Sequence, residues 1–373
     1  MSGGVDSSVA AALLKERGYE VTGVFMQVFQ PDFLECTRTD DRREAMRAAA
    51  HLGIPFLTFN FEKEYKEKVV DYMIAEYAAG RTPNPDIMCN KHIKFDLFLK
   101  KARELGADYI ATGHYTRLCR EFQISNFKFL NNSKFPARNG FAIGDAGGQI
   151  SNSKFKLLKG VDGNKDQSYF LWTLTQEQLK HCLFPIGEYT KPMVREMARK
   201  FGLPNAERRD SQGVCFIGQF PMKEFLKRYV TAEKGSVLDG AGRIIGTHDG
   251  ARLYTMGERH GFLVTKKTPN DPPFYVVAKD IGKNTITVAA QEARDEVTEA
   301  ALANVNFISG IVPENNKVYG ARFRYRQPIQ EASFIIHNSL FIIHFAVPQR
   351  AVTPGQSLVF YDGDECIGGG VIQ

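Results

Sequence analysis

The sequence predicts an α/β fold with a doubly wound parallel sheet, followed by two small β-rich domains. Up to about residue 118, helical patterns alternate with short apolar strand patterns, which is typical of a parallel sheet covered by helices. Beyond about residue 228, short strand patterns are separated by Gly and Asp turns. A chain of 373 residues is also long for a single core. We therefore expect domains at 1–228, 229–295 and 296–373.

The α/β part can be followed element by element. A helix after the opening loop is indicated by Val9, Ala12 and Leu13 at helical spacing, and it ends at Gly18. The β-branched and aromatic run EVTGVFMQVF, residues 20–29, predicts a buried strand. The same patterns predict helices over 42–54, 62–80 and 95–107, and strands over 55–61 and 108–115. In such sheets, ligands bind at the carboxyl ends of the strands.

Two later stretches depart from this alternation. Residues 119–156 are rich in Asn, Ser, Gly and Lys and repeat NSKF, so we expect an inserted surface excursion there. Helical patterns then return through about residue 228. The least polar run, residues 332–347, contains two His and an Asn, and it predicts two strands around an HNS turn rather than a membrane span.

Composition limits the class of protein. Apolar content of 43% and charged content of 24% are those of a soluble globular chain. The net charge of +6 is compatible with a polyanionic partner without requiring one. The Gly-rich start does not resemble a signal peptide, so we expect a cytoplasmic protein with reduced cysteines and no membrane association. The six Cys show no zinc-finger spacing, which argues against that kind of metal site.

The opening loop, MSGGVDSS, predicts an anion site. Gly3 and Gly4 permit positive φ and close backbone approach, so successive N–H groups can point at one anion. The following helix adds the positive end of its dipole. The loop has no terminal Lys and is therefore not a Walker phosphate loop. The alternative is a Gly/Ser turn that merely caps a helix.

Two cysteines lie in kinked loops rich in cations. Cys89 follows Pro83, Pro85 and Asp86 in GRTPNPDIMCNKHIKF, and Cys215 lies in RRDSQGVCFIG. Nearby cations lower a thiol pKa, which predicts reactive cysteines. The alternative for any lone Cys is a small buried core residue. We assign that structural role to Cys36, Cys119, Cys182 and Cys366.

Seven stretches, in this order, resemble the bacterial tRNA-specific 2-thiouridylase family: SGGVDSS, AGRTPNPDIMCNKHIKF, ADYIATGHY, KDQSYFLW, DSQGVCFIG, FRYRQ and AVTPGQ. The first of them resembles the pyrophosphate loop of the ATP pyrophosphatase (PP-loop) superfamily. The resemblance runs nearly end to end and implies an adenine nucleotide alpha hydrolase-like sheet. In that family a β-strand precedes the loop, and the printed sequence starts at the loop, so we expect the first strand to be missing.

The resemblance implies a reaction. AMP from ATP is transferred to O2 of the wobble uridine in tRNA, pyrophosphate is released, and a cysteine persulfide then supplies sulfur as AMP leaves. Cys215 would carry the persulfide, Cys89 would release sulfide or close a disulfide with Cys215, and Asp86 would be the acid/base. ATP is implied as co-substrate with Mg²⁺, without a permanently bound metal. The implied partners are tRNA and a persulfide-donating sulfur-carrier protein.

Further site residues follow from the same resemblance, each at its matching position. The implied ATP ligands are Ser2, Gly3, Gly4, Val5, Asp6, Ser7, Met26 and Gly113. The implied contacts to the target base are Asn84, Pro85 and Asp86. The implied tRNA contacts are His114, Lys165, Asp166, Gln167, Arg324, Tyr325 and Gln356.

Physical reasoning adds two expectations. A carboxylate in a phosphate loop needs a partner, so Asp6 either binds Mg²⁺, which we favour, or caps the helix. In RFRYRQ, Arg322, Arg324 and Arg326 alternate, and on a strand this places three guanidinium groups on one face, suited to phosphate. The alternative is a solvated edge strand.

Two other functions stay open at this point. Another adenylating PP-loop ligase would need no cysteine pair, so Cys89→Ser and Cys215→Ser would keep its activity. A catalytically inactive tRNA-binding protein would show no turnover of ATP to AMP with tRNA.

Overall fold

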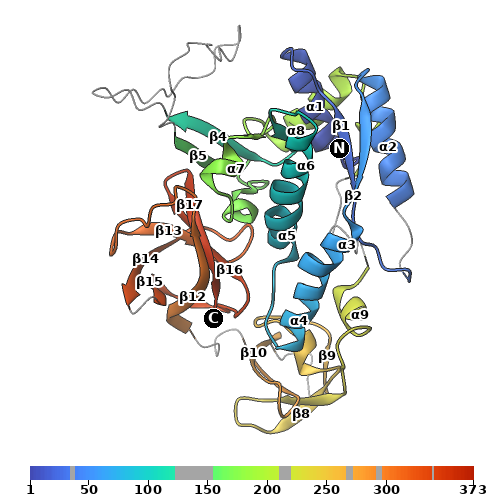
Figure 1. Ribbon diagram of the computed structural model, residues 1–373. Coiled ribbons are helices and arrows are strands. Elements are labelled where there is room, and N and C mark those ends of the chain that lie inside the picture. Colours follow the sequence, from blue (N-terminus) through green and yellow to red (C-terminus); the bar gives the residue numbers. More distant parts are fainter. Residues whose placement is uncertain (34–37, 122–153, 210–219, 266–271, 291–295, 338–339) are drawn as a thin grey trace.

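The computed structural model describes residues 1–373 except 34–37, 122–153, 210–219, 266–271, 291–295 and 338–339 (Figure 1). The α/β part carries helices on both sides of short parallel strands. Its first elements are α1 (Val5–Glu16), β1 (Gly23–Gln27), α2 (Arg38–His51) and β2 (Phe56–Asn60). The later ones are β3 (Ile110–Ala111), η3 (Ser168–Leu171), α7 (Gln176–Leu179), β6 (Cys182–Leu183), α8 (Lys191–Lys200) and α9 (Met222–Leu226).

The parallel arrangement is confirmed. β1 pairs with β2, and β3 pairs with β6, both in parallel register. Within the described residues these pairs are two separate two-stranded sheets rather than one ladder. The apolar face of α1 packs against α8, with Val9 and Leu13 buried in the same cluster as Val194. This contact joins the start of the chain to residues almost two hundred positions later.

Two long helical runs cross the middle of the molecule. The first comprises α3 (Glu62–Tyr65), the π-helical segment η1 (Lys66–Asp71) and α4 (Tyr72–Ala78). The second comprises α5 (Pro85–Met88), the π-helical segment η2 (Cys89–Phe98) and α6 (Leu99–Glu104). The second run begins ten residues before the predicted helix at 95, because Pro85 occupies the first helical position, where its missing N–H costs nothing.

The chain then forms a small mixed sheet at one end of the molecule, in which the β7–β11 pairing is parallel and the other pairings are antiparallel. Its strands are β7 (Gly235–Leu238), β8 (Ile244–His248), β9 (Phe262–Val264), β10 (Phe274–Asp280) and β11 (Thr285–Ala290), with the short 3₁₀ turn η4 (Ala251–Leu253). The strand order is β10-β11-β7-β8-β9. Val237, Ile286 and Val288 of this sheet join Tyr65, Val69 and Met73 of the helices in one buried cluster. The small sheet is therefore packed against the first helical run.

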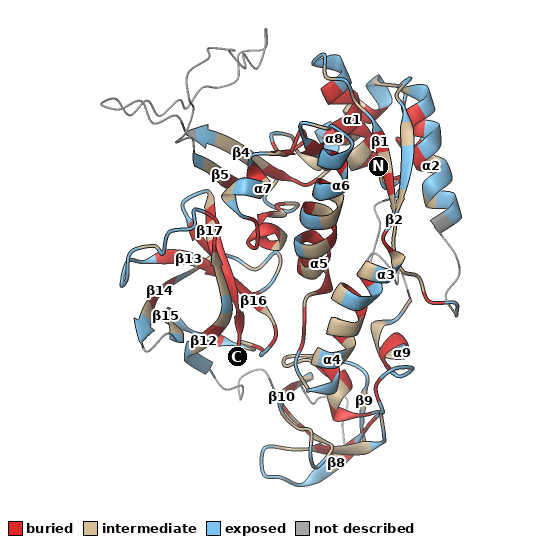
Figure 2. Cartoon of the chain, in the orientation of Figure 1, coloured by how far each residue is buried: buried red, intermediate tan, exposed pale blue. Residues whose placement is uncertain are grey.

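The C-terminal strands close into a barrel. They are β12 (Glu296–Phe307), β13 (Tyr319–Arg322), β14 (Gln330–His337), β15 (Leu340–Arg350), β16 (Ser357–Asp362) and β17 (Glu365–Ile372). The order β12-β15-β14-β13-β16-β17 returns to β12 through the β12–β17 pairing. Figure 2 shows buried residues along these strands. The two β-rich parts predicted after the α/β part are thus confirmed.

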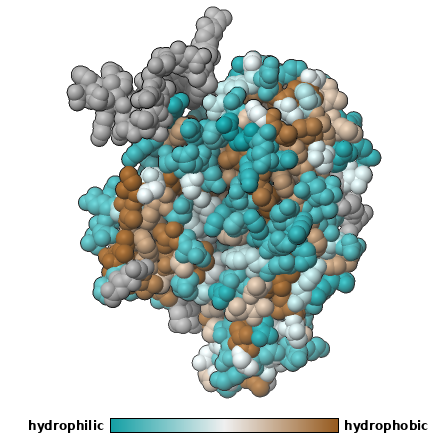
Figure 3. Space-filling model, in the orientation of Figure 1, coloured by the Kyte–Doolittle hydropathy of each residue, from teal (hydrophilic) through white to brown (hydrophobic). Residues whose placement is uncertain are grey.

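The least polar run forms β14 and β15, as predicted. These strands pair in antiparallel register from Ala332↔Phe345 to His337↔Leu340. Their side chains alternate between the barrel core and the surface, so Ile336, Leu340 and Val347 are exposed. Figure 3 shows apolar surface over this part of the barrel. Among the described residues, no helix is both long and apolar enough to cross a membrane.

The predicted excursion at 119–156 is wrong at both of its ends. Residues 119–121 belong to β4 (Thr116–Glu121) and residues 154–156 to β5 (Lys154–Lys159), which pair as an antiparallel ladder. Leu118, Phe155 and Leu157 pack against a buried cluster, which gives these ends a reason to be ordered. Leu158 also pairs with Glu365, so β5 continues the barrel sheet. Residues 122–153 lie outside the described residues.

Candidate functional site

The opening loop turns tightly into α1. Gly3 has φ +79°, and a Cβ there would collide with the Asp41 carbonyl, so the position requires glycine. Gly4 is the N-cap residue of α1, with an extended backbone and no side-chain cap. The Ser7 and Ser8 hydroxyls donate to the Gly4 carbonyl at 3.2 and 3.1 Å. Ser2, Gly3, Gly4, Val5, Asp6 and Ser7 thus surround the positive end of a helix dipole, a setting suited to an anion.

Two residues from much later in the chain, Asn205 and Arg208, form hydrogen bonds with this loop. The sequence motifs predicted neither contact. The Asn205 amide donates to the Gly3 carbonyl at 2.8 Å and to the Ser8 hydroxyl at 3.0 Å. Arg208 donates to the same carbonyl at 3.2 Å and forms an ion pair with Asp41. No local sequence signal connects Asn205 to Gly3, because only the packing of α8 on α1 brings them together.

Asp6 has two donors at one carboxylate oxygen. Its Oδ1 accepts from the Tyr115 hydroxyl at 2.8 Å and from the Lys191 ammonium at 2.7 Å. The helix-cap alternative is wrong, since Gly4 is the cap and Asp6 lies inside the first turn. A metal ion at this oxygen would lie against an ammonium group, so Oδ1 is not suited to Mg²⁺, and ligation of Mg²⁺ by Asp6 stays a prediction. Among the described residues, no cluster of three or more His, Cys, Asp or Glu side chains is suited to a metal.

Of the two other predicted ATP ligands, Gly113 lies against the opening of α1 and Met26 lies on β1. A Cβ on Gly113 would lie 2.8 Å from the backbone of Asp6 and Ser7, so the loop after β3 touches the first turn of α1. Met26 is on β1, partly buried beside the cluster that contains Cys89. Contact of either residue with a nucleotide stays a prediction.

Cys89 lies at the junction between α5 and η2. Asn84 caps α5 by accepting from the Ile87 N–H at 3.3 Å, and Pro85 and Asp86 form its first turn. Cys89 is 4% exposed and belongs to the buried cluster around Tyr65 and Ile93. The local arrangement therefore places Asp86 and Cys89 on neighbouring turns of one helical run.

Burial, rather than charge, sets the pKa of these groups. Burial raises the pKa of the Cys89 thiol, an effect that Lys94 opposes, Asp86 reinforces and a hydrogen bond from Tyr65 opposes. The expectation that cations lower this pKa overall is therefore wrong, since desolvation outweighs them. Burial also raises the pKa of Asp86 against the opposing charge of Lys94. A carboxyl whose pKa is raised is closer to exchanging a proton near neutral pH.

Cys215 lies outside the described residues, as does the whole of 210–219. The approach of Cys215 to Cys89 therefore stays a prediction. Arg208, two residues before that range, contacts the opening loop.

The Lys165-Asp166-Gln167 segment is largely built into the fold. Asp166 is 2% exposed and accepts from the N–H groups of Gly160 and Ser168, both at 3.1 Å, and from Arg322 at 3.0 Å. Gln167 pairs with Tyr115 through two hydrogen bonds of 2.9 and 3.0 Å. Lys165 is half-buried. Tyr115 thus connects the opening loop, through Asp6, to this segment.

His114 is also an interior residue. It is 7% exposed, lies 5.8 Å from the Phe95 ring, and has its Nδ1 2.8 Å from the Thr112 hydroxyl. Burial holds its pKa well below the usual range, and Lys94 adds to this effect. Side chains as buried as His114 and Asp166 cannot touch a macromolecule without moving, so the structure does not favour their predicted tRNA contacts.

The alternating arginines do not share one strand face. β13 ends at Arg322, and Arg326 takes φ +64° in the following turn. Arg322 pairs with Asp166, whereas Arg324 donates to the carbonyls of Met256 and Ala351 at 3.1 and 2.9 Å. The predicted row of three guanidinium groups is therefore wrong, because the strand ends before its second arginine.

The remaining predicted tRNA contacts, Tyr325 and Gln356, lie in or near the turn that follows β13. The Tyr325 ring is 4.7 Å from the Phe170 ring and has the Arg326 guanidinium 5.1 Å from its centre. Gln356 donates to the Thr82 carbonyl at 3.0 Å, linking the barrel to the segment before α5. Arg324 and Arg326 are exposed, and Tyr325 is half-buried.

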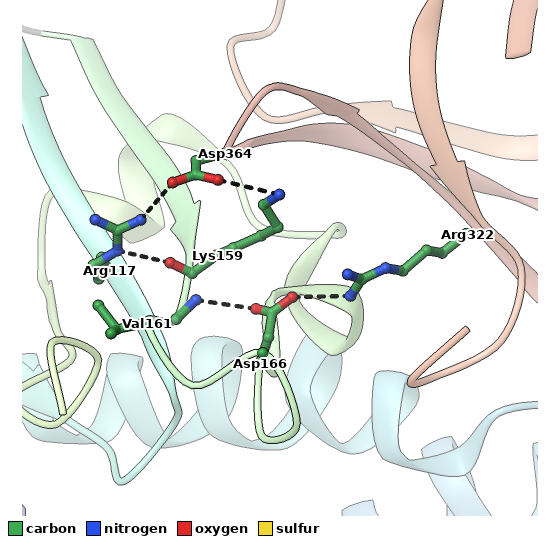
Figure 4. Close-up of a pocket in the computed structure, with 8 residues that line it drawn as sticks. Arg117, Lys159, Val161, Asp166, Arg322 and Asp364 are labelled. Atoms are coloured by element: carbon green, nitrogen blue, oxygen red, sulfur yellow. Dashed lines mark hydrogen bonds and ion pairs between the residues drawn. The ribbon is translucent and has the colours of Figure 1, made fainter. Parts of the chain in front are cut away.

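A polar pocket of about 400 Å³ lies between the β4–β5 hairpin and the barrel (Figure 4). Asp364 pairs with Arg117 at 2.9 Å and with Lys159 at 3.1 Å, and Asp166 pairs with Arg322. The pocket is lined by Arg117, Lys159, Gly160, Val161, Gly163, Asp166, Arg322 and Asp364. Each of its three cations pairs with one of these two carboxylates, which favours a role as an interface between parts of the chain.

Comparisons with known proteins agree with this architecture. Residues 1–219 match a family model described as the tRNA methyl transferase HUP domain. Residues 223–290 match the tRNA methyl transferase PRC-barrel domain, and residues 297–372 match the aminomethyltransferase beta-barrel domain. The three matched ranges follow one another along the chain as the predicted domains do.

Full-length relatives are similar as well. A protein of Streptococcus mutans serotype c, named tRNA-specific 2-thiouridylase MnmA, is 44% identical over 377 residues, covering 100% of this chain and 93% of the relative. Proteins of the same name from Streptococcus thermophilus and Streptococcus sanguinis are each 43% identical with the same coverage. The similarity therefore includes both cysteine-bearing stretches and the opening loop.

Proposed function

Because this chain belongs to the tRNA-specific 2-thiouridylase family, we propose that it is a tRNA-uridine 2-sulfurtransferase that makes 2-thiouridine at the wobble position of tRNA. The observation that carries this proposal is the 44% identity over the whole chain. The geometry of the opening loop and of Cys89 is compatible with it.

The first step is adenylation of the uracil O2 by ATP. A carbonyl oxygen is a poor leaving group, and its bond to AMP converts it into a phosphate leaving group. The loop from Ser2 to Ser7 would hold the departing pyrophosphate with backbone N–H groups and the helix dipole. Mg²⁺ would arrive bound to the phosphates of ATP. Gly113, which lies against the first turn of α1, and Met26 of β1 would contact the nucleoside.

The second step moves sulfur to C2. A sulfur-carrier protein would load Cys215 as a persulfide, whose terminal sulfur attacks C2 while AMP leaves with the oxygen. The Cys89 thiolate would then attack the Cys215 sulfur, giving a disulfide and leaving the sulfur on the base. A thiol reductant would restore both cysteines. Asp86, with its raised pKa, would exchange protons at the base beside Asn84 and Pro85.

Cys89, which would react after Cys215, is buried. Burial raises the pKa of the Cys89 thiol, so less of it is present as the nucleophilic thiolate than in an exposed cysteine. The target uridine must itself leave its stack, since its C2 edge is otherwise shielded. Exposed Arg324 and Arg326, with Lys165, Tyr325 and Gln356 nearby, would contribute to tRNA contact.

The experiment uses the full chain, tRNA with a wobble uridine, ATP, Mg²⁺ and a persulfide donor. Nucleoside mass spectrometry measures 2-thiouridine, and pyrophosphate release measures adenylation. We expect Cys89→Ser and Cys215→Ser to abolish 2-thiouridine and to retain tRNA-dependent pyrophosphate release. Cys119→Ser, a half-buried cysteine on β4, is the matched control and keeps both activities.

Two outcomes would contradict the proposal. A modified tRNA product formed equally well by both serine variants would indicate another adenylating ligase. A folded chain that binds tRNA without any pyrophosphate release would indicate a binding protein.

A further inference from the structure

The first turn of α1 carries a charge that opposes its expected ligand. Asp6 is the second residue of the helix, beside the loop whose N–H groups suit an anion. A bare carboxylate there would repel a polyphosphate, at a few kcal/mol for charges about 4 Å apart near a protein surface. The sequence offers no cation within the loop itself.

The fold brings a cation to this carboxylate from a distant helix. Lys191 Nζ lies 2.7 Å from Asp6 Oδ1, and the Tyr115 hydroxyl holds the same oxygen at 2.8 Å. The Lys191 side chain is only 12% exposed, and its backbone N–H is anchored by Asp162 at 2.8 Å. The ion pair is therefore better shielded from solvent than an ordinary surface pair.

The position of Lys191 within its own helix strengthens the argument. It is the first residue of α8, where the positive end of the helix dipole disfavours a cation. An acidic or uncharged residue at this position would stabilise α8 itself better. The ammonium group instead forms its favourable interaction with Asp6, across the contact between α1 and α8.

We propose that Lys191 is a positioning residue for the nucleotide: it neutralises Asp6 so that the first turn of α1 accepts the phosphates of ATP. The inference rests on the proposed use of ATP by this site. Lys191 acts through Asp6 and not as a direct phosphate ligand. Asp6 is accordingly a neutralised, structural carboxylate rather than a magnesium ligand.

The test is binding of inorganic pyrophosphate to the full chain in EDTA, by calorimetry at fixed ionic strength. We expect Lys191→Met to weaken binding about tenfold, which corresponds to about 1.4 kcal/mol. The double variant Lys191→Met with Asp6→Asn should return to within about threefold of the unmodified chain, because the repelling charge is gone. Lys200→Met, at the exposed end of the same helix, removes the same charge and should leave binding unchanged.

Asp6→Asn alone gives a second test that does not depend on the folding of the lysine variants. It should bind metal-free pyrophosphate at least as tightly as the unmodified chain. A double variant as weak as Lys191→Met would mean that the lysine contacts phosphate directly and would overturn the inference. Unchanged binding by Lys191→Met would also overturn it. If the unmodified chain bound no metal-free pyrophosphate, the inference would fail, whereas the proposed use of ATP is tested separately by pyrophosphate release with Mg²⁺ and tRNA.

Discussion

Cys89 is buried, and two groups moderate the effect of that burial on its thiol. The Lys94 charge and the Tyr65 hydroxyl both lower the thiol pKa, while burial and the Asp86 charge raise it. The charged thiolate therefore depends on Lys94 for part of its stability.

We predict that Lys94→Met raises the pKa of Cys89 further. Alkylation of this cysteine at pH 8 should then be slower than in the unmodified chain, because less of it is thiolate. Site-resolved mass spectrometry of alkylation against pH measures the effect. Lys91→Met, an exposed lysine three residues away, is the matched control. Equal slowing by both variants would show that net charge, and not the position of Lys94, controls the thiol.

At the scale of elements, the contact between α1 and the loop after β3 depends on a missing side chain. A Cβ on Gly113 would lie 2.8 Å from two backbone atoms of the first turn of α1. Backbone atoms cannot rotate away as a flexible side chain can, so the two elements would have to separate.

We predict that Gly113→Ala lowers the free energy of unfolding by about 2 kcal/mol. Gly163→Ala, where a Cβ meets nothing within 4 Å, should change it by less than about 0.5 kcal/mol. Urea unfolding of both variants measures the difference. Similar values for the two substitutions would refute the close contact at Gly113.

At the scale of the whole molecule, a buried ion pair joins the barrel to the α/β part. Arg322 of β13 is 12% exposed and Asp166 is 2% exposed, and their side chains are 3.0 Å apart. Removing one partner leaves the other charge buried and unpaired.

We predict that Arg322→Met costs about 3 kcal/mol of unfolding free energy. Adding Asp166→Asn should recover part of that loss, since the unpaired charge is then absent. Lys317→Met removes one partner of an exposed pair with Asp362 on the same barrel and should cost less than about 1 kcal/mol. Thermal and urea unfolding provide the comparison, and equal costs for the two single variants would contradict it.

A second link at this scale is sensitive to pH. Lys279 of β10 donates to the carbonyls of Gly80, after α4, and Tyr254, in the small sheet domain, at 2.8 and 2.6 Å. Burial lowers its pKa from 10.5 to about 8, with Glu258 acting in the opposite direction. Between these two pH values the unfolded chain holds more protons than the folded chain, so stability due to Lys279 rises with pH.

We predict that the unmodified chain gains about 2 kcal/mol relative to Lys279→Met between pH 7 and pH 10. Urea unfolding of both chains at a series of pH values measures this difference. The contributions of the other titrating groups are the same in both chains and therefore cancel. Lys283→Met, an exposed lysine that follows β10, should run parallel to the unmodified chain. A Lys279→Met curve that also runs parallel would exclude this linkage.

Several helices and strands could be predicted from local sequence patterns, whereas the end of β13 and the pKa of Cys89 could not. Helical and strand patterns located α1, β1, β2 and the β14–β15 hairpin, because their apolar, β-branched and aromatic residues follow one another at local spacing. The arginine alternation failed because periodicity cannot show where a strand ends, and β13 ends at Arg322. The pKa of Cys89 was misjudged for a similar reason, since neighbouring charges are visible in a sequence and burial is not.

The amino-acid sequence by itself determined the α/β class, the two β-rich parts, the opening loop and the family to which the chain belongs. Those features depend on local spacing and on short motifs. Only the tertiary structure decided which residues complete the loop: Asn205 and Arg208 hold Gly3, and Lys191 with Tyr115 holds Asp6. These partners lie more than a hundred residues away from the loop, and their contacts are created by the packing of α8, and of the segment after β3, against α1.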